Sequence, residues 1–341
     1  MIKLLSQLEQ SLMEKYYGKK AKVNKMEAKN IYQKLGCQQV INACGYMTKL
    51  GTSTVKPLVL QQMNEASQNF VVIEELYQII NKKITSLLKV EAAQPVNSAA
   101  SGIALSCAAI IYKTNFLDVY QSVEQNEIII PKGHNINFGA PIEMMMKVGG
   151  AKVVEAGWSN GCTKDDIISK ITNKKARLLY VVSHHCVQKN MISLSEYLAV
   201  ARLYHLPVIV DCAAEDNLQK YCDLDLWILS GAKALNGPTS GLVLGKKEYI
   251  YNLKHHFKGI GRTMKIGKEN IIGLLCALEN YLNNSQHQNN TFSALETLIT
   301  KINNNKYFVA SLGQDTVRKI NRCRISLLNE NIELLKKLIR C

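Results

Sequence analysis

Two residues that could do chemistry, an aspartate and a lysine, each follow an apolar stretch typical of a buried strand. Asp211 ends the stretch 207–211, and Lys233 comes four residues after the stretch 226–229. Open α/β folds bind ligands beyond the carboxyl ends of their strands, so both side chains are expected at one edge of a sheet. Partial burial at such an edge lowers the pKa of a lysine, which suits an amine that forms an imine.

An aspartate and a lysine at one sheet edge are the two groups that pyridoxal phosphate (PLP) requires. The carboxylate keeps the pyridine nitrogen protonated, so that the ring can accept electrons, and the lysine forms the Schiff base. Taken singly, Asp211 could cap a helix and Lys233 could be an ordinary lysine of a surface turn. Their combination favours the cofactor.

A run of small residues directly after the expected strand 92–96 could bind the phosphate of that cofactor. Small side chains let the backbone N–H groups at a helix N-terminus close on a phosphate, and serine hydroxyls add donors. A small-residue helix packed tightly on the sheet would explain the run equally well. Ser230, three residues before Lys233, is another candidate donor. The run consists of Ser98, Ala99, Ala100 and Ser101.

Several histidines call for an interpretation. His134, just after an apolar stretch, could stack on the cofactor ring or be a structural histidine at a strand end. His184 and His185 are adjacent, and adjacent strand residues point to opposite faces, so we predict no metal site there. One of the two could still face the active-site edge. We expect His255 and His256, in a lysine-rich helical stretch, at the surface.

A glycine-punctuated segment carries three cations, Arg262, Lys265 and Lys268, within seven residues. Arginine donates as a planar fork and lysine acts as a point charge, so Arg262 and Lys265 could grip an anionic group of a small-molecule substrate. A plain solvated loop would have the same composition. From the spacing alone, the solvated loop is the better interpretation.

The segments that must position these residues alternate between short apolar runs and amphipathic stretches. Runs rich in β-branched residues between helices are typical of parallel strands buried on both faces and joined by right-handed crossovers. The sequence therefore predicts an α/β sheet, followed by a mainly helical stretch and a small C-terminal lobe. The expected strands are 92–96, 127–131, 152–155, 176–183, 207–211, 225–229, 241–244, 307–312 and 318–327. The expected helices are 58–70, 76–88, 101–112, 136–148, 164–172, 194–204, 271–282, 294–302 and one from 330.

Composition and charge narrow the class of protein. The net charge is +15, but the lysines are spread along the chain and aromatic residues are few. A general lysine bias therefore explains the charge better than an anionic substrate, and RNA comes third. The ten cysteines form no CxxC pair, which argues against disulfides and a zinc site and favours a reducing cytoplasm. With no secretion signal and no apolar stretch long enough to span a bilayer, the chain is expected to be soluble and cytoplasmic.

Four stretches of the chain carry specific motifs. They read VINACG at 40–45, SHHCVQK at 183–189, SGAKALNGPTSG at 230–241 and MKIGKEN at 264–270. In these motifs the chain resembles the D-glucosaminate-6-phosphate ammonia-lyase family, which belongs to the fold-type-I PLP enzymes related to bacterial selenocysteine synthase. The resemblance extends from about residue 32 to about residue 281 and weakens beyond it.

The resemblance implies a fold-type-I architecture with a mostly parallel seven-stranded sheet flanked by helices. It also implies that Lys233 is the Schiff-base lysine, that Asp211 holds the ring nitrogen, and that His134 stacks on the ring. The remaining matches are Ala213 beneath the ring, Ser98 to Ser101 at the phosphate, and Arg262 and Lys265 at the anionic end of the substrate.

The implied reaction is a β-elimination that deaminates a phosphorylated 2-amino sugar acid. Lys233, displaced by the amino group of the substrate, would remove the α-proton, while the ring and Asp211 stabilise the carbanion. Loss of the 3-hydroxyl and hydrolysis would give ammonia and 2-keto-3-deoxy-gluconate 6-phosphate or a similar product. Related enzymes are homodimers or larger rings, so a homo-oligomer is implied.

Three parts of the chain are expected: a basic helical extension at 1–31, a large PLP-binding domain at 32–260, and a linker helix with a shortened small domain at 261–341. The alternative enzyme is an L-seryl-tRNA selenium transferase, which shares the core and suits the basic charge. The extension is shorter than the tRNA-binding domain of those enzymes, so we expect no tRNA partner. A non-catalytic PLP-binding paralogue is the second alternative: the shortened C-terminus favours it, and the Asp211–Lys233 pair opposes it.

Overall fold

The computed structural model describes residues 30–42, 44–121, 125–137, 139–172, 176–284, 291–304, 307–314 and 321–328. The chain divides into two compact units, residues 1–53 and residues 54–341. In the first unit, the short helix α2 (Ile31–Lys34) begins with a capping box between Asn30 and Gln33. Most of the extension predicted at 1–31, and all of the helix predicted from 330, lie outside the described residues.

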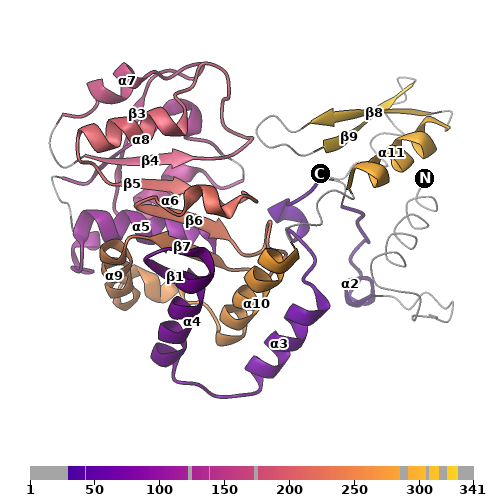
Figure 1. The fold of residues 1–341 in the computed structure, drawn as a ribbon, viewed down its shortest axis with the longest axis horizontal. Coiled ribbons are helices and arrows are strands. Elements are labelled where there is room, and N and C mark those ends of the chain that lie inside the picture. The colour runs from indigo at the N-terminus through magenta and orange to yellow at the C-terminus, as the bar shows by residue number, and fades with distance from the viewer. Residues whose placement is uncertain are drawn as a thin grey trace. The chain divides into compact units, whose positions relative to one another are not determined.

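A seven-stranded sheet forms the centre of the second unit (Figure 1). Its strands are β1 (Ala92–Val96), β2 (Glu127–Pro131), β3 (Lys152–Ala156), β4 (Arg177–Val181), β5 (Val208–Asp211), β6 (Leu226–Ser230) and β7 (Gly241–Gly245). They are arranged in the order β1-β7-β6-β5-β4-β2-β3. Only the pairs that β7 makes with β1 and β6 are antiparallel. The predicted mostly parallel α/β sheet is confirmed.

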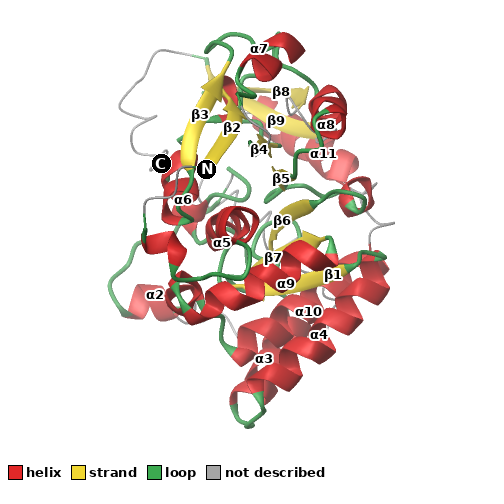
Figure 2. Cartoon of the chain, turned by 90° about the vertical axis from the view of Figure 1, so that its left-hand side faces the viewer, coloured by secondary structure: helices red, strands yellow, loops and turns green. Residues whose placement is uncertain are grey.

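Helices cover both faces of this sheet. They are α3 (Pro57–Ser67), α4 (Ile73–Leu88), α5 (Ala99–Tyr112), α6 (Ile142–Val148), α7 (Lys164–Ser169), α8 (Leu194–Leu203), α9 (Lys247–His255) and α10 (Lys268–Asn284). Successive strand residues point to opposite faces. In β6, Leu226 and Ile228 enter the core shared with α5, α6 and α9, whereas Trp227 and Leu229 enter the core shared with α4, α8 and α10. Figure 2 shows α5 and α8 on opposite sides of the strands.

Several predicted elements are shorter than expected, and two of these differences bear on the site. The helix predicted at 136–148 begins only at Ile142, because Pro141 precedes it as the N-cap and forms an isolated bridge with Asn137. The strand predicted at 176–183 ends at Val181, and the chain turns directly after it. Residues 184 and 185 are therefore not part of a strand.

The described C-terminal residues form a small lobe. Helix α11 (Thr291–Asn303) packs on the antiparallel pair β8 (Phe308–Gln314) and β9 (Asn321–Leu327). Ile302, Phe308 and Ala310 make a separate small core there, and the two strands predicted for the lobe are confirmed. Among the helices that the structure describes, none combines the length and the apolar character needed to cross a membrane.

Candidate active site

All strands of the large sheet except β7 run in the same direction and therefore end at one edge. Four of the predicted site residues lie at this edge. Ser98 follows β1, Lys233 follows β6, Asp211 ends β5, and His134 follows β2. Strands β5 and β6 are direct neighbours, with Asp211 paired to Ile228. The fold thus brings the aspartate and the lysine to adjacent positions, as the sequence predicts.

Asp211 is a buried carboxylate, 6% exposed, at the end of β5. Burial raises its pKa, while the charge of Lys233 and the N–H of Ala213, which donates to Oδ1 at 3.0 Å, act in the opposite direction. The net effect is a raised pKa, so desolvation raises the pKa by more than these two neighbours lower it. A protonated ring nitrogen beside Asp211 would add a second positive charge to that of Lys233, so this residue fits the PLP pyridine.

Lys233 lies in the turn between β6 and β7, residues 231–240, which we name the lysine turn. Internal hydrogen bonds shape the turn: the Gly231 N–H donates to Ser240 O at 2.9 Å, and the Gly237 N–H donates to Gly231 O at 2.8 Å. Asn236 adopts a left-handed conformation, φ 52°, and its N–H donates to Lys233 O at 3.0 Å. The half-buried lysine therefore stands on a closed and internally bonded loop.

Ser98 is the N-cap of α5, a helix of 14 residues. Its hydroxyl accepts from the Ser101 N–H at 3.1 Å and lies 2.9 Å from the Ser101 hydroxyl, which also bonds Asn97 Oδ1. The N–H groups of Ala99 and Ala100 belong to the first turn, whose backbone donors have no partner within the helix. Two hydroxyls and the positive end of a helix thus meet at one point, as a phosphate site requires.

Gly241, which the sequence reasoning did not single out, joins this helix N-terminus to the lysine turn. As the first residue of β7, it pairs with Val96 at the end of β1 and with Ser230 at the end of β6. A Cβ on Gly241 would lie 2.4 Å from both the carbonyl carbon and the oxygen of Ser98. The missing side chain therefore lets the backbone at Ser98 come close to Ser230, the other predicted phosphate donor. The only sequence signal was the glycine that closes the motif at 230–241.

His134 is 3% exposed and belongs to the 3-10 turn η3 (Lys132–His134) after β2. Its ring meets the Tyr180 ring edge-on at a centroid distance of 4.4 Å, and Nδ1 accepts from the Val181 N–H at 3.4 Å. Burial lowers the pKa of His134 to about 4. The imidazole is therefore neutral at pH 7, with its proton on Nε2.

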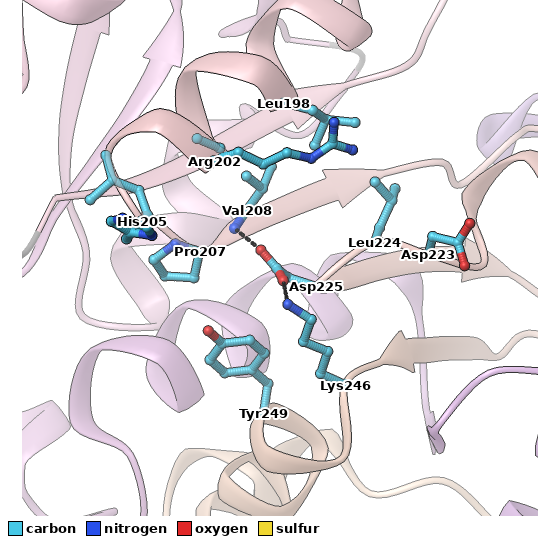
Figure 3. A pocket seen from close by; sticks show the side chains of 12 residues that line it. Leu198, Arg202, His205, Pro207, Val208, Asp223, Leu224, Asp225, Lys246 and Tyr249 are labelled. Atoms are coloured by element: carbon cyan, nitrogen blue, oxygen red, sulfur yellow. Dashed lines mark hydrogen bonds and ion pairs between the residues drawn. The ribbon is translucent and has the colours of Figure 1, made fainter.

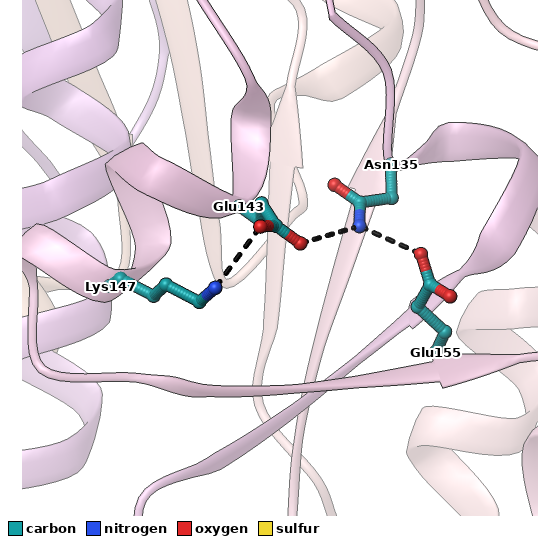
Figure 4. A network of polar contacts seen from close by, with 4 residues as sticks. All are labelled: Asn135, Glu143, Lys147 and Glu155. Carbon is teal, nitrogen blue, oxygen red and sulfur yellow. Dashed lines mark hydrogen bonds and ion pairs between the residues drawn. The ribbon is translucent and has the colours of Figure 1, made fainter.

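A polar network holds the segment that follows His134 (Figure 4). The Asn135 amide donates to Glu155 Oε1 at 2.8 Å and to Glu143 Oε2 at 3.2 Å. Lys132 pairs with Glu155 at 3.3 Å, and Lys147 pairs with Glu143 at 3.0 Å. The network ties the η3 turn to β3 and α6. It is largely solvent-exposed, so each ion pair contributes little to stability.

Cys186, in the turn after β4, is a buried thiol near Asp211. Burial, and then the charge of Asp211, raise its pKa to about 12. A thiol held in this protonated form is a poor nucleophile. Cys186 is therefore not a candidate nucleophile at this edge.

Arg262 and Lys265 are both exposed, the first in the 3-10 turn η6 (Ile260–Met264) and the second directly after it. The segment leads into α10, whose Asn270 amide donates to Thr239 O of the lysine turn at 3.2 Å. Helix α10 therefore links the segment that carries these two cations to the lysine turn.

Two expectations about other histidines were wrong in their geometry. The His184 and His185 rings do not point to opposite faces: they lie 4.0 Å apart, because β4 ends before them and strand alternation no longer applies. Within the described parts of the chain, no group of three or more His, Cys, Asp or Glu side chains could hold a metal. His256, expected at the surface, is fully buried, and its Nε2 bonds Lys113 O at 2.8 Å, directly after α5.

A cavity of about 410 Å³ lies at the opposite, amino edge of the sheet (Figure 3). It opens where β5 and β6 begin, and Asp225 at its floor accepts from the Val208 N–H at 3.1 Å and pairs with Lys246. Arg202, His205 and Tyr249 also line it. None of the predicted site residues does, so this cavity is separate from the candidate active site.

Comparisons with known proteins agree with this geometry. The family model described as SelA, L-seryl-tRNA selenium transferase, matches residues 40–321. D-glucosaminate-6-phosphate ammonia lyase of Salmonella typhimurium is 44% identical over 74% of this chain and 70% of that protein. 5'-C-glycyluridine monooxygenase-decarboxylase of a Streptomyces species is 36% identical over 73% of this chain and 65% of that protein. A solved structure of D-glucosaminate-6-phosphate ammonia-lyase has a TM-score of 0.79 and 40% identity, covering 88% of this chain and 83% of that one. The expected fold class, fold type I, is confirmed.

Proposed function

Since the chain belongs to the SelA (L-seryl-tRNA selenium transferase) family, and within it is similar to an ammonia lyase, we propose that it is a PLP-dependent ammonia lyase acting on a phosphorylated 2-amino sugar acid. The family and the fold are those of PLP-dependent enzymes. The resemblance predicted from the sequence motifs is thereby confirmed.

The buried Asp211 carboxylate next to Lys233 is the observation that carries this proposal. A carboxylate with a raised pKa at the ligand-binding edge needs a positive neighbour, and an adjacent lysine turn offers an amine for covalent attachment. In our proposal Ser98, Ser101 and Ser230 hold the phosphate. His134 and Ala213 pack against the two faces of the ring, and Asp211 meets its nitrogen.

When bound, PLP supplies a ring that accepts the electron pair left on the substrate α-carbon. The residues of the chain supply binding and proton transfer. Lys233 would take the α-proton of the substrate, for which its amine must be unprotonated. The neutral His134 adds no positive charge that would compete with the ring nitrogen for the Asp211 carboxylate.

The remaining steps follow from the substrate class that we propose. The 3-hydroxyl leaves as water, and hydrolysis then releases the nitrogen as ammonia, so that one water leaves and one is consumed. The products are ammonia and a 2-keto-3-deoxy sugar acid phosphate, with D-glucosaminate 6-phosphate as the leading candidate substrate. Arg262 and Lys265, exposed at the start of α10, are the candidates for binding the anionic end.

We also propose that the protein is a cytoplasmic homo-oligomer. Between α3 and α4, the consecutive apolar residues Phe70, Val71 and Val72 are all exposed, and the Phe70 side chain is fully so. An apolar run of this kind usually marks an interaction surface. The buried free thiols Cys107, Cys162 and Cys212 suit a reducing compartment.

Borohydride trapping tests the cofactor, and ammonia release tests the substrate. Wild type incubated with PLP is expected to turn yellow and to retain the cofactor on Lys233 after reduction. Lys233→Ala should lose both signals, whereas Lys247→Ala, which removes an exposed lysine beyond β7, should keep them. Ammonia release is then measured over a panel of phosphorylated 2-amino sugar acids. Wild type that binds no PLP would refute the proposal, and an inert panel would refute the substrate class.

Selenium transfer to seryl-tRNA is the second candidate. The description of the matching family and the net charge of +15 favour it. Filter binding of tRNA at physiological salt distinguishes the two, because binding driven by charge alone weakens steeply as salt rises. Tight binding of tRNA at that salt would support the transferase.

A further inference from the structure

The lysine turn has two sides. Its inner side is closed by the backbone hydrogen bonds of Gly231 and Gly237, and its outer side faces α10. The turn starts and ends on β6 and β7, and the Ser230 N–H donates to Ala213 O at 3.2 Å, so the sheet fixes one side of it. The position of the Lys233 amine also depends on the contact that holds the outer side. That contact is made by α10, a helix that starts 35 residues later in the chain.

Close packing sets the distance between the turn and α10. A Cβ on Gly231 would lie 2.7 Å from Leu274 Cδ1, and one on Gly237 would lie 2.8 Å from Ala277 Cβ. On the helix itself, a Cβ on Gly273 would lie 2.8 Å from Pro238 Cγ. These contacts are apolar, and they set how closely the turn approaches the helix.

Asn270 makes the directional contact of this interface. Its amide donates to Thr239 O at 3.2 Å. The next residue, Ser240, accepts from the Gly231 N–H through its carbonyl, and Gly231 lies two residues before Lys233. The Asn270 amide is thus linked to Gly231, two residues before Lys233, through Ser240 and one backbone hydrogen bond.

The first turn of α10, which carries Asn270, is itself held in place by contacts with α3. The Lys268 ammonium bonds the carbonyl oxygens of Ala66 and Ser67, the latter at 2.8 Å, at the C-terminus of α3. A cation at this end of a helix also interacts favourably with the helix dipole. Met63 of α3 packs against Gly273 one turn further along α10.

From this geometry we propose that Asn270 is a positioning residue for Lys233: its amide fixes the lysine turn on α10 and so sets where the amine stands relative to Asp211. The inference rests on the proposed function only in calling Lys233 the reactive amine. It predicts that loss of the Asn270 amide shifts the turn without unfolding the protein.

The test compares Asn270→Asp, which keeps the shape but removes the donor and adds a negative charge, and Asn270→Ala, which removes the donor without adding a charge, with Asn284→Asp at the other end of the same helix. A change is attributed to the lost donor only where both Asn270 variants show it. Asn284 is exposed, and its amide bonds only Asn280 among the described residues. In the PLP-loaded protein, Asn270→Asp should lower kcat by about 3- to 10-fold, the worth of one hydrogen bond, and leave KM within about 2-fold. It should also move the pH midpoint of the visible absorbance of the lysine-bound cofactor, and Asn284→Asp should not.

Hydrogen exchange gives a readout that needs neither cofactor nor substrate. In the cofactor-free protein, the amides of Gly231 and Gly237 should exchange faster in Asn270→Asp and in Asn270→Ala, while the rest of α10 keeps its protection. Unchanged exchange and an unchanged midpoint would overturn the proposal. So would a general loss of thermal stability in both Asn270 variants, because this would show a merely structural role. If wild type binds no PLP, the proposed function fails while faster exchange still supports the tie between Asn270 and the turn.

Discussion

Acid should destabilise this protein through His134, and the size of the effect follows from the burial of that residue. The folded imidazole has a pKa of about 4, against an ordinary value of 6.5. At pH values between these two pKa values, the histidine of the unfolded chain is therefore protonated, whereas that of the folded chain is neutral. Stability is lost as the pH falls through 6.5, and the loss is complete near the folded pKa of about 4.

The magnitude can be worked out for a fall from about pH 7.5 to about pH 5. Proton binding to each state contributes a factor of 1 + 10^(pKa − pH). At about pH 5 this factor is about 33 for the histidine of the unfolded chain and about 1.1 for that of the folded chain. Their ratio corresponds to about 2 kcal/mol, and at about pH 7.5 the same contribution is below about 0.1 kcal/mol. Wild type should lose this amount through His134 alone, in addition to the effect of other groups.

Urea unfolding of the cofactor-free protein at the two pH values measures the loss. Trp227, which is fully buried in the sheet core, provides the fluorescence signal. His134→Gln should lose about 2 kcal/mol less than wild type over this pH range. Ile129→Val, a core change in the neighbouring strand that removes no titrating group, should follow wild type with a constant offset of about 1 kcal/mol. If His134→Gln lost as much stability as wild type, the reasoning from burial would be refuted.

Three further outcomes are expected. Gly241→Ala places a Cβ 2.4 Å from the Ser98 backbone, so the Kd for PLP, measured by absorbance titration, should rise by about 10-fold or more; an unchanged Kd would contradict the close approach. Asp211→Asn keeps the shape but removes the charge, so kcat for ammonia release should fall by about 100-fold while borohydride still traps the cofactor on Lys233; full activity would exclude the role of the carboxylate. Burial lowers the pKa of His256, so His256→Gln should reduce the loss of stability below about pH 6.5 in the same urea experiment, and an unchanged pH dependence would show that this histidine does not contribute.

Local patterns were enough to find the strands and the two principal residues. An apolar run long enough to cross a sheet, ended by one polar residue, predicts both the strand and the edge at which its last side chain stands. Asp211 and Lys233 were found in this way, and the structure has them at adjacent strand ends. Their roles stay predictions, as do those of Arg262 and Lys265.

Predictions of features that depend on where a segment packs in the fold were less successful. His256 looked like a surface residue because it lies in a lysine-rich stretch, but it is buried and bonds the carbonyl of Lys113, 143 positions away in the chain. His184 and His185 were judged by the rule for strands, although β4 had already ended. Local composition carries no information on either point, because burial and strand ends depend on contacts with distant segments.

The sequence by itself thus determined the type of chemistry: a lysine and an aspartate at strand ends, a small-residue helix N-terminus, and motifs of one family. Only the tertiary structure decided how these parts are held together. Gly241 lies between the phosphate cradle and the lysine turn because β7 is inserted antiparallel between β1 and β6. Asn270 reaches Thr239 because α10 packs on that turn. Both facts depend on strand order and on helix packing, which arise when distant segments bury their apolar faces together and which no local spacing encodes.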